Sequence, residues 1–194
     1  MGIAIAVFIV AALVLLCVGY FVSLYNSLVR LRNNVKESWS NIDVLMKQRH
    51  DEIPKLIAAC KEYMSYEKGT FQKIVEARQQ VETVRQSGDV AQMGAAETAL
   101  RGSLNGLFAL AENYPDLKAN ASFQQLQSRI SDLETKISDR RELYNDSVNI
   151  NNIAIEQFPA TIIANHYHFT HSDLLQFTVE ETKDVDVTNL FEGK

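Results

Sequence analysis

Hydrophobic residues follow two different patterns along the chain. Residues 1–29 contain no Asp, Glu, Lys, Arg or His, and Ile3–Tyr25 is almost continuously apolar. Beyond this run, apolar residues recur every three or four positions, which predicts helices with one buried face. A helix that is apolar all round needs a lipid or fully buried environment, whereas an amphipathic helix packs one side on a core. The pattern therefore predicts an anchor, residues 1–26, followed by a helical body.

The apolar run is long enough to cross a membrane. As a helix, Ile3–Tyr25 would rise about 35 Å, and the hydrocarbon core of a bilayer is about 30 Å thick. A cleaved signal peptide is the alternative, but its basic first residues and small-x-small cleavage site are missing. A lipoprotein site at Cys17 is weaker, because Leu16 stands where a small residue is needed. We predict a retained transmembrane helix with Tyr20 and Tyr25 near one interface.

The body begins with a long amphipathic helix. Its apolar stripe comprises Leu24, Leu28, Leu31, Val35, Trp39, Ile42, Leu45 and Met46 and resumes at Ile53, Leu56, Ile57, Cys60 and Met64. This predicts a helix from the membrane to about residue 66, with a kink near Pro54. Gly69 makes a break plausible, but the apolar register continues through Phe71, Ile74, Val75, Val81 and Val84. A second helix, about 68–87, is therefore either separate or continuous with the first.

Two further helices complete the body. The turn at Ser87–Asp89 precedes a third helix, for which Asp89 is the candidate N-cap and which ends at "YPDL". Gly94, Gly102 and Gly106 within it predict close packing against another backbone. Ser122 is the predicted cap of the last helix, about 37 residues long, whose apolar repeat runs from Phe123 to Phe158. Polar residues interrupt that repeat at Arg140–Arg141 and Asn151.

The helix lengths predict the architecture. The first and last helices of the body are similar in length and the middle two are about half as long, which fits an up-down-up-down path with short turns. We predict an all-α protein: a transmembrane helix, an elongated antiparallel bundle of four-helix type at 27–160, and a membrane-proximal segment with an acidic tail at 161–194. The last helix would bring "FPATIIANHYHFTH" back to the level where the anchor ends.

Charge and cysteines narrow the function. A net charge of −5 disfavours nucleic acid as a partner. Arg30, Arg32 and Lys36 follow the anchor, so the positive-inside rule places the body in the cytoplasm. Cys17 lies in the anchor and Cys60 on an apolar helix face, which indicates neither a disulfide nor a metal site. No cofactor is predicted.

Three motifs are candidates for chemistry. In "RHDEIP", Arg49 and His50 precede Pro54, but consecutive helical residues point in different directions; a polar belt is favoured over an active site or a subunit contact. His166, His168 and His171 form the only metal-like spacing, with interface histidines or a pH-sensitive contact as alternatives. Pro115 in "AENYPDLKAN" predicts a helix–helix turn in which Asp116 is a candidate cap, or else a small-molecule loop. The other interface or structural candidates are Trp39, Arg140, Arg141, Tyr144, Asn145, Phe158 and Pro159.

Three segments in this order resemble the LemA family of bacterial membrane-anchored helical proteins: "YNSLVRLRNNVKESWSNIDVLMKQRHDEIPKLI", "FALAENYPDLKANASFQQLQ" and "RRELYNDSVNINNIAIEQFP". The resemblance implies a single N-terminal span in the bacterial inner membrane, an antiparallel helical bundle and no established enzymatic activity. Some relatives carry a lipoprotein-type N-terminus, which would place the body on the other side of the membrane.

Two non-enzymatic functions follow from these features. The first is a scaffold that contacts the bilayer, self-associates into a higher-order homo-oligomer and organises or remodels the membrane. The second is a tether that binds another membrane-associated protein through the free end of the body or the tail. An enzyme is disfavoured because the sequence has no glycine-rich phosphate loop, Ser-His-Asp order or paired inward carboxylates.

Overall fold

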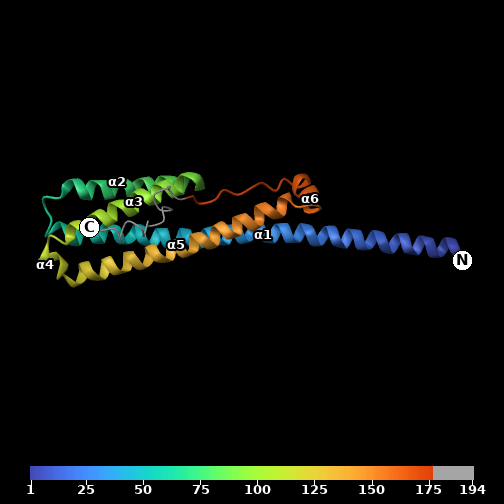
Figure 1. Ribbon diagram of the computed structural model, residues 1–194, viewed down its shortest axis with the longest axis horizontal. Coiled ribbons are helices and arrows are strands. Elements are labelled where there is room, and N and C mark those ends of the chain that lie inside the picture. Colours follow the sequence, from blue (N-terminus) through green and yellow to red (C-terminus); the bar gives the residue numbers. More distant parts are fainter. Residues whose placement is uncertain (177–194) are drawn as a thin grey trace, which may run out of the picture. The chain divides into compact units, whose positions relative to one another are not determined.

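The protein is helical throughout the region that its computed structural model describes, residues 1–176. Six helices follow one another, and no strand occurs in that range (Figure 1). They are α1 (Gly2–Lys61), α2 (Lys68–Ser87), α3 (Val90–Ala111), α4 (Pro115–Lys118), α5 (Ala121–Glu156) and α6 (Ala160–His166). The described residues divide into two compact units, Met1–Met46 with Thr135–Leu174, and Lys47–Glu134 with Leu175 and Gln176. The predicted acidic tail falls mostly outside the described residues.

The first part of α1 has the character of a membrane span. Within residues 1–176, α1 alone is long and apolar enough to cross a bilayer, with a mean hydropathy of 3.0 in its most apolar window. No residue of that window is buried by the protein. Large apolar side chains such as Ile3, Phe8 and Leu15 are more than 70% exposed. Such a surface is stable where lipid replaces water, because the apolar side chains then avoid contact with water.

In the first unit, α1 and α5 run antiparallel. Leu28 packs with Ile155, and ten residues further along α1 the Ser38 hydroxyl lies 3.1 Å from that of Ser147. Residue numbers rise along α1 while those of the neighbouring residues on α5 fall, so the two helices are antiparallel. The buried apolar residues of this unit include Leu28, Val35, Ile42 and Met46 of α1 and Ile137, Tyr144, Val148 and Ile155 of α5. They are members of the predicted stripes.

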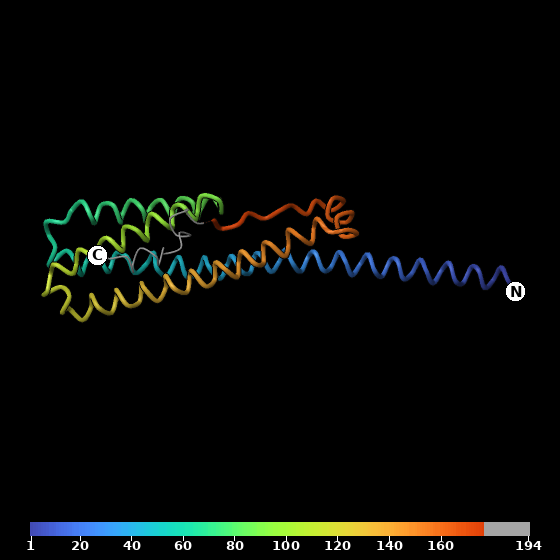
Figure 2. Tube along the Cα trace, in the orientation of Figure 1, coloured from blue at the N-terminus to red at the C-terminus, as the bar shows by residue number. Residues whose placement is uncertain are grey.

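In the second unit, four helical segments share buried apolar residues. α2 and α3 pack along each other, as the Cα trace shows (Figure 2). The core takes Ile53, Leu56, Ile57 and Cys60 from α1, Phe71, Ile74 and Val81 from α2, Leu100, Leu104 and Leu107 from α3, and Phe123 and Ile130 from α5. Val75 does not belong to it: the side chain is 45% exposed, so its place on the predicted apolar face was wrong.

The helix boundaries settle several predictions. α1 ends at Lys61, not near 66, and residues 62–67 separate it from α2, so the helix is broken before Gly69. Gly88 closes α2 with φ of 71°, and Asp89 caps α3 by accepting the Gln92 N–H at 3.1 Å, as predicted. Ser122 does not cap α5. The Asn120 side chain does so, because its Oδ1 accepts the Phe123 N–H at 3.0 Å.

The α3 glycines were predicted to lie against another backbone, and only one does. A Cβ on Gly94 would lie 1.7 Å from the carbonyl oxygen of Gln176, so the chain after α6 passes directly over this position. Nothing lies within 4 Å of a Cβ built on Gly102 or Gly106, so the expectation was wrong for these two.

Candidate functional site

The end of α5 and all of α6 return to the part of α1 where the apolar run ends. Leu28 of α1 is buried with Ile155, Ile163 and Ala164. Tyr25 contacts the rings of Tyr167, at a centroid distance of 4.8 Å, and Phe169, at 6.1 Å. The return of "FPATIIANHYHFTH" to this level, inferred from helix lengths, is therefore confirmed by contacts within the first unit.

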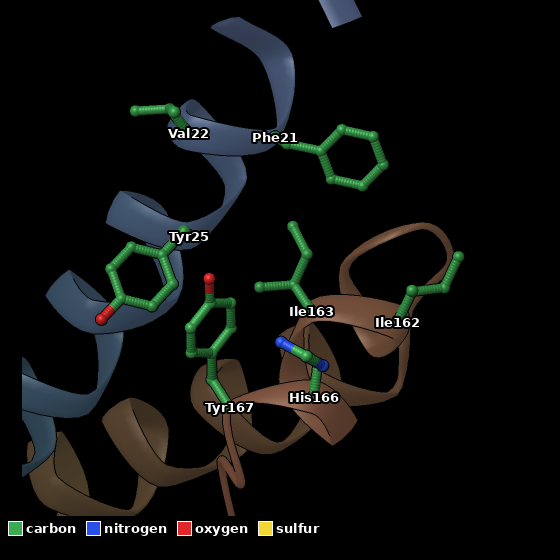
Figure 3. A pocket seen from close by; sticks show the side chains of 7 residues that line it. All are labelled: Phe21, Val22, Tyr25, Ile162, Ile163, His166 and Tyr167. Atoms are coloured by element: carbon green, nitrogen blue, oxygen red, sulfur yellow. The ribbon is translucent and has the colours of Figure 1, made fainter. Parts of the chain in front are cut away.

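An apolar groove lies between α1 and α6. It has a volume of about 380 Å³ and is lined by Phe21, Val22, Tyr25, Ile162, Ile163, His166 and Tyr167. We call it the α1–α6 groove. Ile163 points across it toward α1, while Tyr25 and Tyr167 face each other at one end (Figure 3). Phe21, Val22, Ile162 and Tyr167 are each about half exposed, so apolar surface continues from the span onto α6.

The chain after α6 is fastened along α5. His168 has a left-handed φ of 55°, which turns the chain after α6. Asn152 then pairs with both backbone groups of Ser172: its Nδ2 donates to the carbonyl at 2.9 Å and its Oδ1 accepts the N–H at 3.0 Å. The Tyr144 hydroxyl donates to the Asp173 carbonyl at 2.8 Å. We call residues 169–174 the strap. It holds α6 in place on α1, since both ends of the helix are then constrained.

The three histidines are not brought together. The His166 ring is edge-on to Tyr167, and His171 pairs with Glu156 at 2.7 Å. Within residues 1–176, no group of three or more His, Cys, Asp or Glu side chains is arranged to hold a metal ion. His166, however, lines the α1–α6 groove.

Arg49 is the centre of a buried ionic cluster in the second unit. Its side chain is 1% exposed, and its guanidinium donates to the carboxylates of Glu97 on α3 and Glu134 on α5. Arg101 donates to the other oxygen of Glu134 at 3.0 Å. Burial by itself lowers the pKa of Arg49, but the two carboxylates outweigh it and the pKa is raised. The cluster therefore joins α1, α3 and α5 around Arg49.

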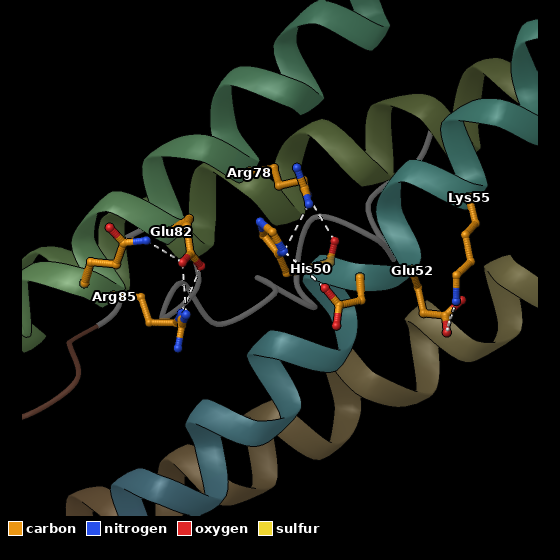
Figure 4. A network of polar contacts seen from close by, with 8 residues as sticks. His50, Glu52, Lys55, Arg78, Glu82 and Arg85 are labelled. Carbon is orange, nitrogen blue, oxygen red and sulfur yellow. Dashed lines mark hydrogen bonds and ion pairs between the residues drawn. The ribbon is translucent and has the colours of Figure 1, made fainter.

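Pro54 explains the role of His50. Proline has no N–H, so the His50 carbonyl four residues earlier has no helical donor. Arg78 of α2 takes that role: its Nε donates to the His50 carbonyl at 3.0 Å and its Nη2 lies 3.1 Å from His50 Nδ1 (Figure 4). α1 runs through Pro54 as one helix. The proline position is therefore a specific attachment point for α2.

The remaining candidates have separate places. Tyr144 packs on Trp39 with ring centroids 5.4 Å apart. Arg141 is buried, whereas Arg140 is exposed and Asn145 half-buried. Phe158, placed on the apolar repeat by its spacing, is 81% exposed and lies beyond the end of α5; Pro159 stands at the N-cap of α6.

Two other candidates lie at buried or turn positions. Pro115 opens the short helix α4, with Tyr114 rather than Asp116 at its N-cap. Burial raises the pKa of the Cys60 thiol to about 11, so this cysteine is a core residue with little thiolate.

Comparison with known proteins agrees with the motifs. The model of the LemA family matches residues 38–188. The chain belongs to the LemA family. The match starts after the apolar run and extends further toward the C-terminus than the three quoted segments, to include the strap.

The chain is similar in sequence to proteins named LemA and MamQ. Protein LemA of Metamycoplasma hominis is 28% identical over 185 residues, which cover 91% of this chain and 81% of the relative. Magnetosome protein MamQ of Magnetospirillum gryphiswaldense is 23% identical over 163 residues, covering 72% of this chain and 60% of the relative. Magnetosome protein MamQ 1 of Paramagnetospirillum magneticum is 19% identical over 175 residues, covering 78% and 64%.

The apolar start of α1 and the similarity to LemA and MamQ proteins indicate that this LemA-family protein is associated with a membrane. The names LemA and MamQ do not denote enzymes.

Several residues of these sites were missed by reading the sequence. Glu97 and Glu134 were not singled out, although an arginine on an apolar stripe needs buried carboxylate partners. Arg78 was also missed, although any proline inside a helix leaves a carbonyl that needs a donor. Asn152, which fastens the strap, had no distinguishing signal in the sequence.

Proposed function

We propose that this LemA-family protein is a non-enzymatic scaffold that is anchored by one helix in the bacterial inner membrane, associates with copies of itself and organises or remodels the bilayer. Its body is an antiparallel four-helix-type bundle on the cytoplasmic side, because Arg30, Arg32 and Lys36 follow the span. Membrane contact occurs at two places, the span and the neighbouring apolar surface of α6. The similarity to proteins named for the magnetosome links the family to a cellular structure rather than to a reaction.

The observation that carries self-association is an apolar stripe on the outside of α5. Leu143, Ile150 and Ile153 are 51%, 55% and 53% exposed, and their spacing of seven and three places them on one helix face. Exposed apolar residues that cluster on one face mark interaction sites more often than scattered ones do. A second copy is the occupant we propose, because anchored helical bodies that share one orientation present the same stripe side by side.

Charged substitutions on this stripe test the proposal. Full-length protein in lipid nanodiscs should form an oligomer by mass photometry. The variant Leu143→Glu/Ile150→Glu/Ile153→Glu should shift it to the monomer, because like charges would be buried at the contact. The control Gln125→Glu/Ser128→Glu places the same charge at exposed polar positions of α5 several turns away from the stripe, and it should leave the oligomer intact. Unchanged subunit number in the glutamate variant, with circular dichroism unchanged, would remove this surface as the contact.

A second candidate function, a tether, is favoured by a groove in the second unit. It has a volume of about 510 Å³ and is lined by Ile57, Lys61, Ser65, Lys68, Phe71, Gln72 and Val75. Apolar walls with two lysines suit an acidic amphipathic peptide of another membrane-associated protein.

The tether is tested separately from the scaffold. Lys61→Glu/Lys68→Glu should weaken binding of a co-purified partner at least tenfold, with subunit number unchanged. A further variant without residues 180–194 shows whether the tail shares in that binding. If neither variant changes what co-purifies, the tether is wrong and the scaffold is unaffected.

A further inference from the structure

We propose that the α1–α6 groove holds one acyl chain of a bilayer phospholipid, with the lipid phosphate toward His166 and Arg32. This inference rests on the proposed function, because it requires the apolar part of α1 to lie in a membrane. The proposed function treats the apolar surface of α6 as a second place of contact with the membrane, and this inference adds a specific lipid-binding site there.

The position of the groove identifies its occupant. Phe21 and Val22 form one wall and belong to the apolar run of α1. In the most apolar window of that helix, no residue is buried by the protein. Ile162 and Ile163 of α6 form the opposite wall. A volume of about 380 Å³ is at the lower end of the range for small-molecule pockets, roughly 300–1,000 Å³. A slender, fully apolar group continuous with the lipid around the span fits these walls.

The polarity of the groove changes along α1 as a phospholipid requires. Phe21 and Val22 are apolar, and one turn further the rings of Tyr25 and Tyr167, which carry hydroxyls, lie at one end of the groove (Figure 3). Two turns beyond Tyr25, on the same face, the guanidinium of Arg32 lies 5.0 Å from the centre of the Phe169 ring. Cationic side chains at this level attract lipid phosphate, and tyrosines favour the interface.

The strap gives the site its rigidity. Asn152 fixes Ser172 through two hydrogen bonds, and Phe169 packs with the buried cluster around Leu28. α6 is thus held at both ends, and its spacing from α1 does not depend on lipid. A preformed site binds without the cost of ordering its walls.

The test counts retained phospholipid and subunits in one measurement. Full-length protein in mild detergent is mixed with phosphatidylglycerol and analysed by native mass spectrometry. We expect one phospholipid per chain to remain bound after the others are removed. Val22→Trp fills the groove from a half-exposed position and should reduce that retention at least tenfold. The control Val14→Trp, also half-exposed but away from the groove, should retain the lipid.

A second variant keeps the test independent of ring size. Ile162→Glu places a charge in the wall at a position that is 52% exposed, so the fold should survive while retention falls by a similar factor. Equal retention in Val22→Trp, Ile162→Glu and Val14→Trp would mean annular lipid only and overturn the proposal. Loss of subunits instead of lipid would show that a second copy fills the groove. Loss of lipid from the two groove variants with subunit number unchanged supports the lipid site. A wild-type protein that is monomeric and still retains one lipid would overturn only the proposal that the protein self-associates.

Discussion

Replacing Arg49 with methionine is expected to lower the free energy of unfolding by about 3–5 kcal/mol, because it removes one partner of a buried ionic cluster. Glu97 would then be left 6% exposed with no cation, and Glu134 would keep only Arg101. A buried carboxylate without a partner keeps its full desolvation cost. For a chain of this length, such a loss lowers Tm by roughly 6–20 °C.

The measurement is thermal unfolding by circular dichroism of full-length protein in detergent. The matched control is Lys118→Met, which breaks an ion pair with Glu112 whose two side chains are each 59% exposed; its expected cost is below about 1 kcal/mol. Arg49→Met/Glu97→Leu should recover part of the loss, because the uncompensated charge is removed as well. If Arg49→Met costs no more than the control, water reaches the carboxylates and the cluster is not a structural centre.

The sequence predicted the buried faces well because each helix is amphipathic. Leu28, Val35, Ile42 and Met46 are buried as their spacing indicated. Two apolar residues that spacing placed on a buried face are exposed. Val75 of α2 lines the open groove of the second unit with Ile57 and Lys61. Phe158 lies after the last turn of α5. The spacing of apolar residues predicts which face of a helix is buried, but it does not predict how far the neighbouring helix covers that face.

The candidate sites were predictable only in part. The similar lengths of the first and last helices of the body predicted that the chain after Phe158 returns to the level where the anchor ends. The groove itself depends on the turn between α5 and α6 and on the left-handed His168, which spacing does not reveal. The partners of Arg49 are 48 and 85 residues away in the chain. Pairing at that distance depends on the register between helices, which one sequence does not determine.

Replacing Tyr144 with alanine is expected to cost about 3–5 kcal/mol in the first unit, as for other buried aromatic residues. Tyr144 is 3% exposed and packs on Trp39, so the variant loses ring burial and an aromatic pair. Tyr144→Phe is the matched control. It keeps the ring and loses only the hydrogen bond to the Asp173 carbonyl, worth about 0.5–1.5 kcal/mol.

Trp39 is the only tryptophan, so its fluorescence during urea unfolding reports on this contact directly. Equal stability of the alanine and phenylalanine variants would show that the ring is not part of the core, whatever its exposure.

Tyr144 also makes the stability of the fold depend on pH, and the direction of that dependence follows from its raised pKa. Burial first, and the Asp173 carboxylate second, raise the pKa of Tyr144 to about 12 from its ordinary value of 10. The folded protein therefore holds this proton more tightly than the unfolded chain does. Stability from the neutral hydroxyl is fully present below pH 10 and is lost as the pH rises toward 12. Tyr144→Phe should lose less stability than the wild type across that interval, because phenylalanine has no proton to release. Identical alkaline profiles would mean that the hydroxyl titrates as freely as in the unfolded chain, which would contradict its burial against the strap.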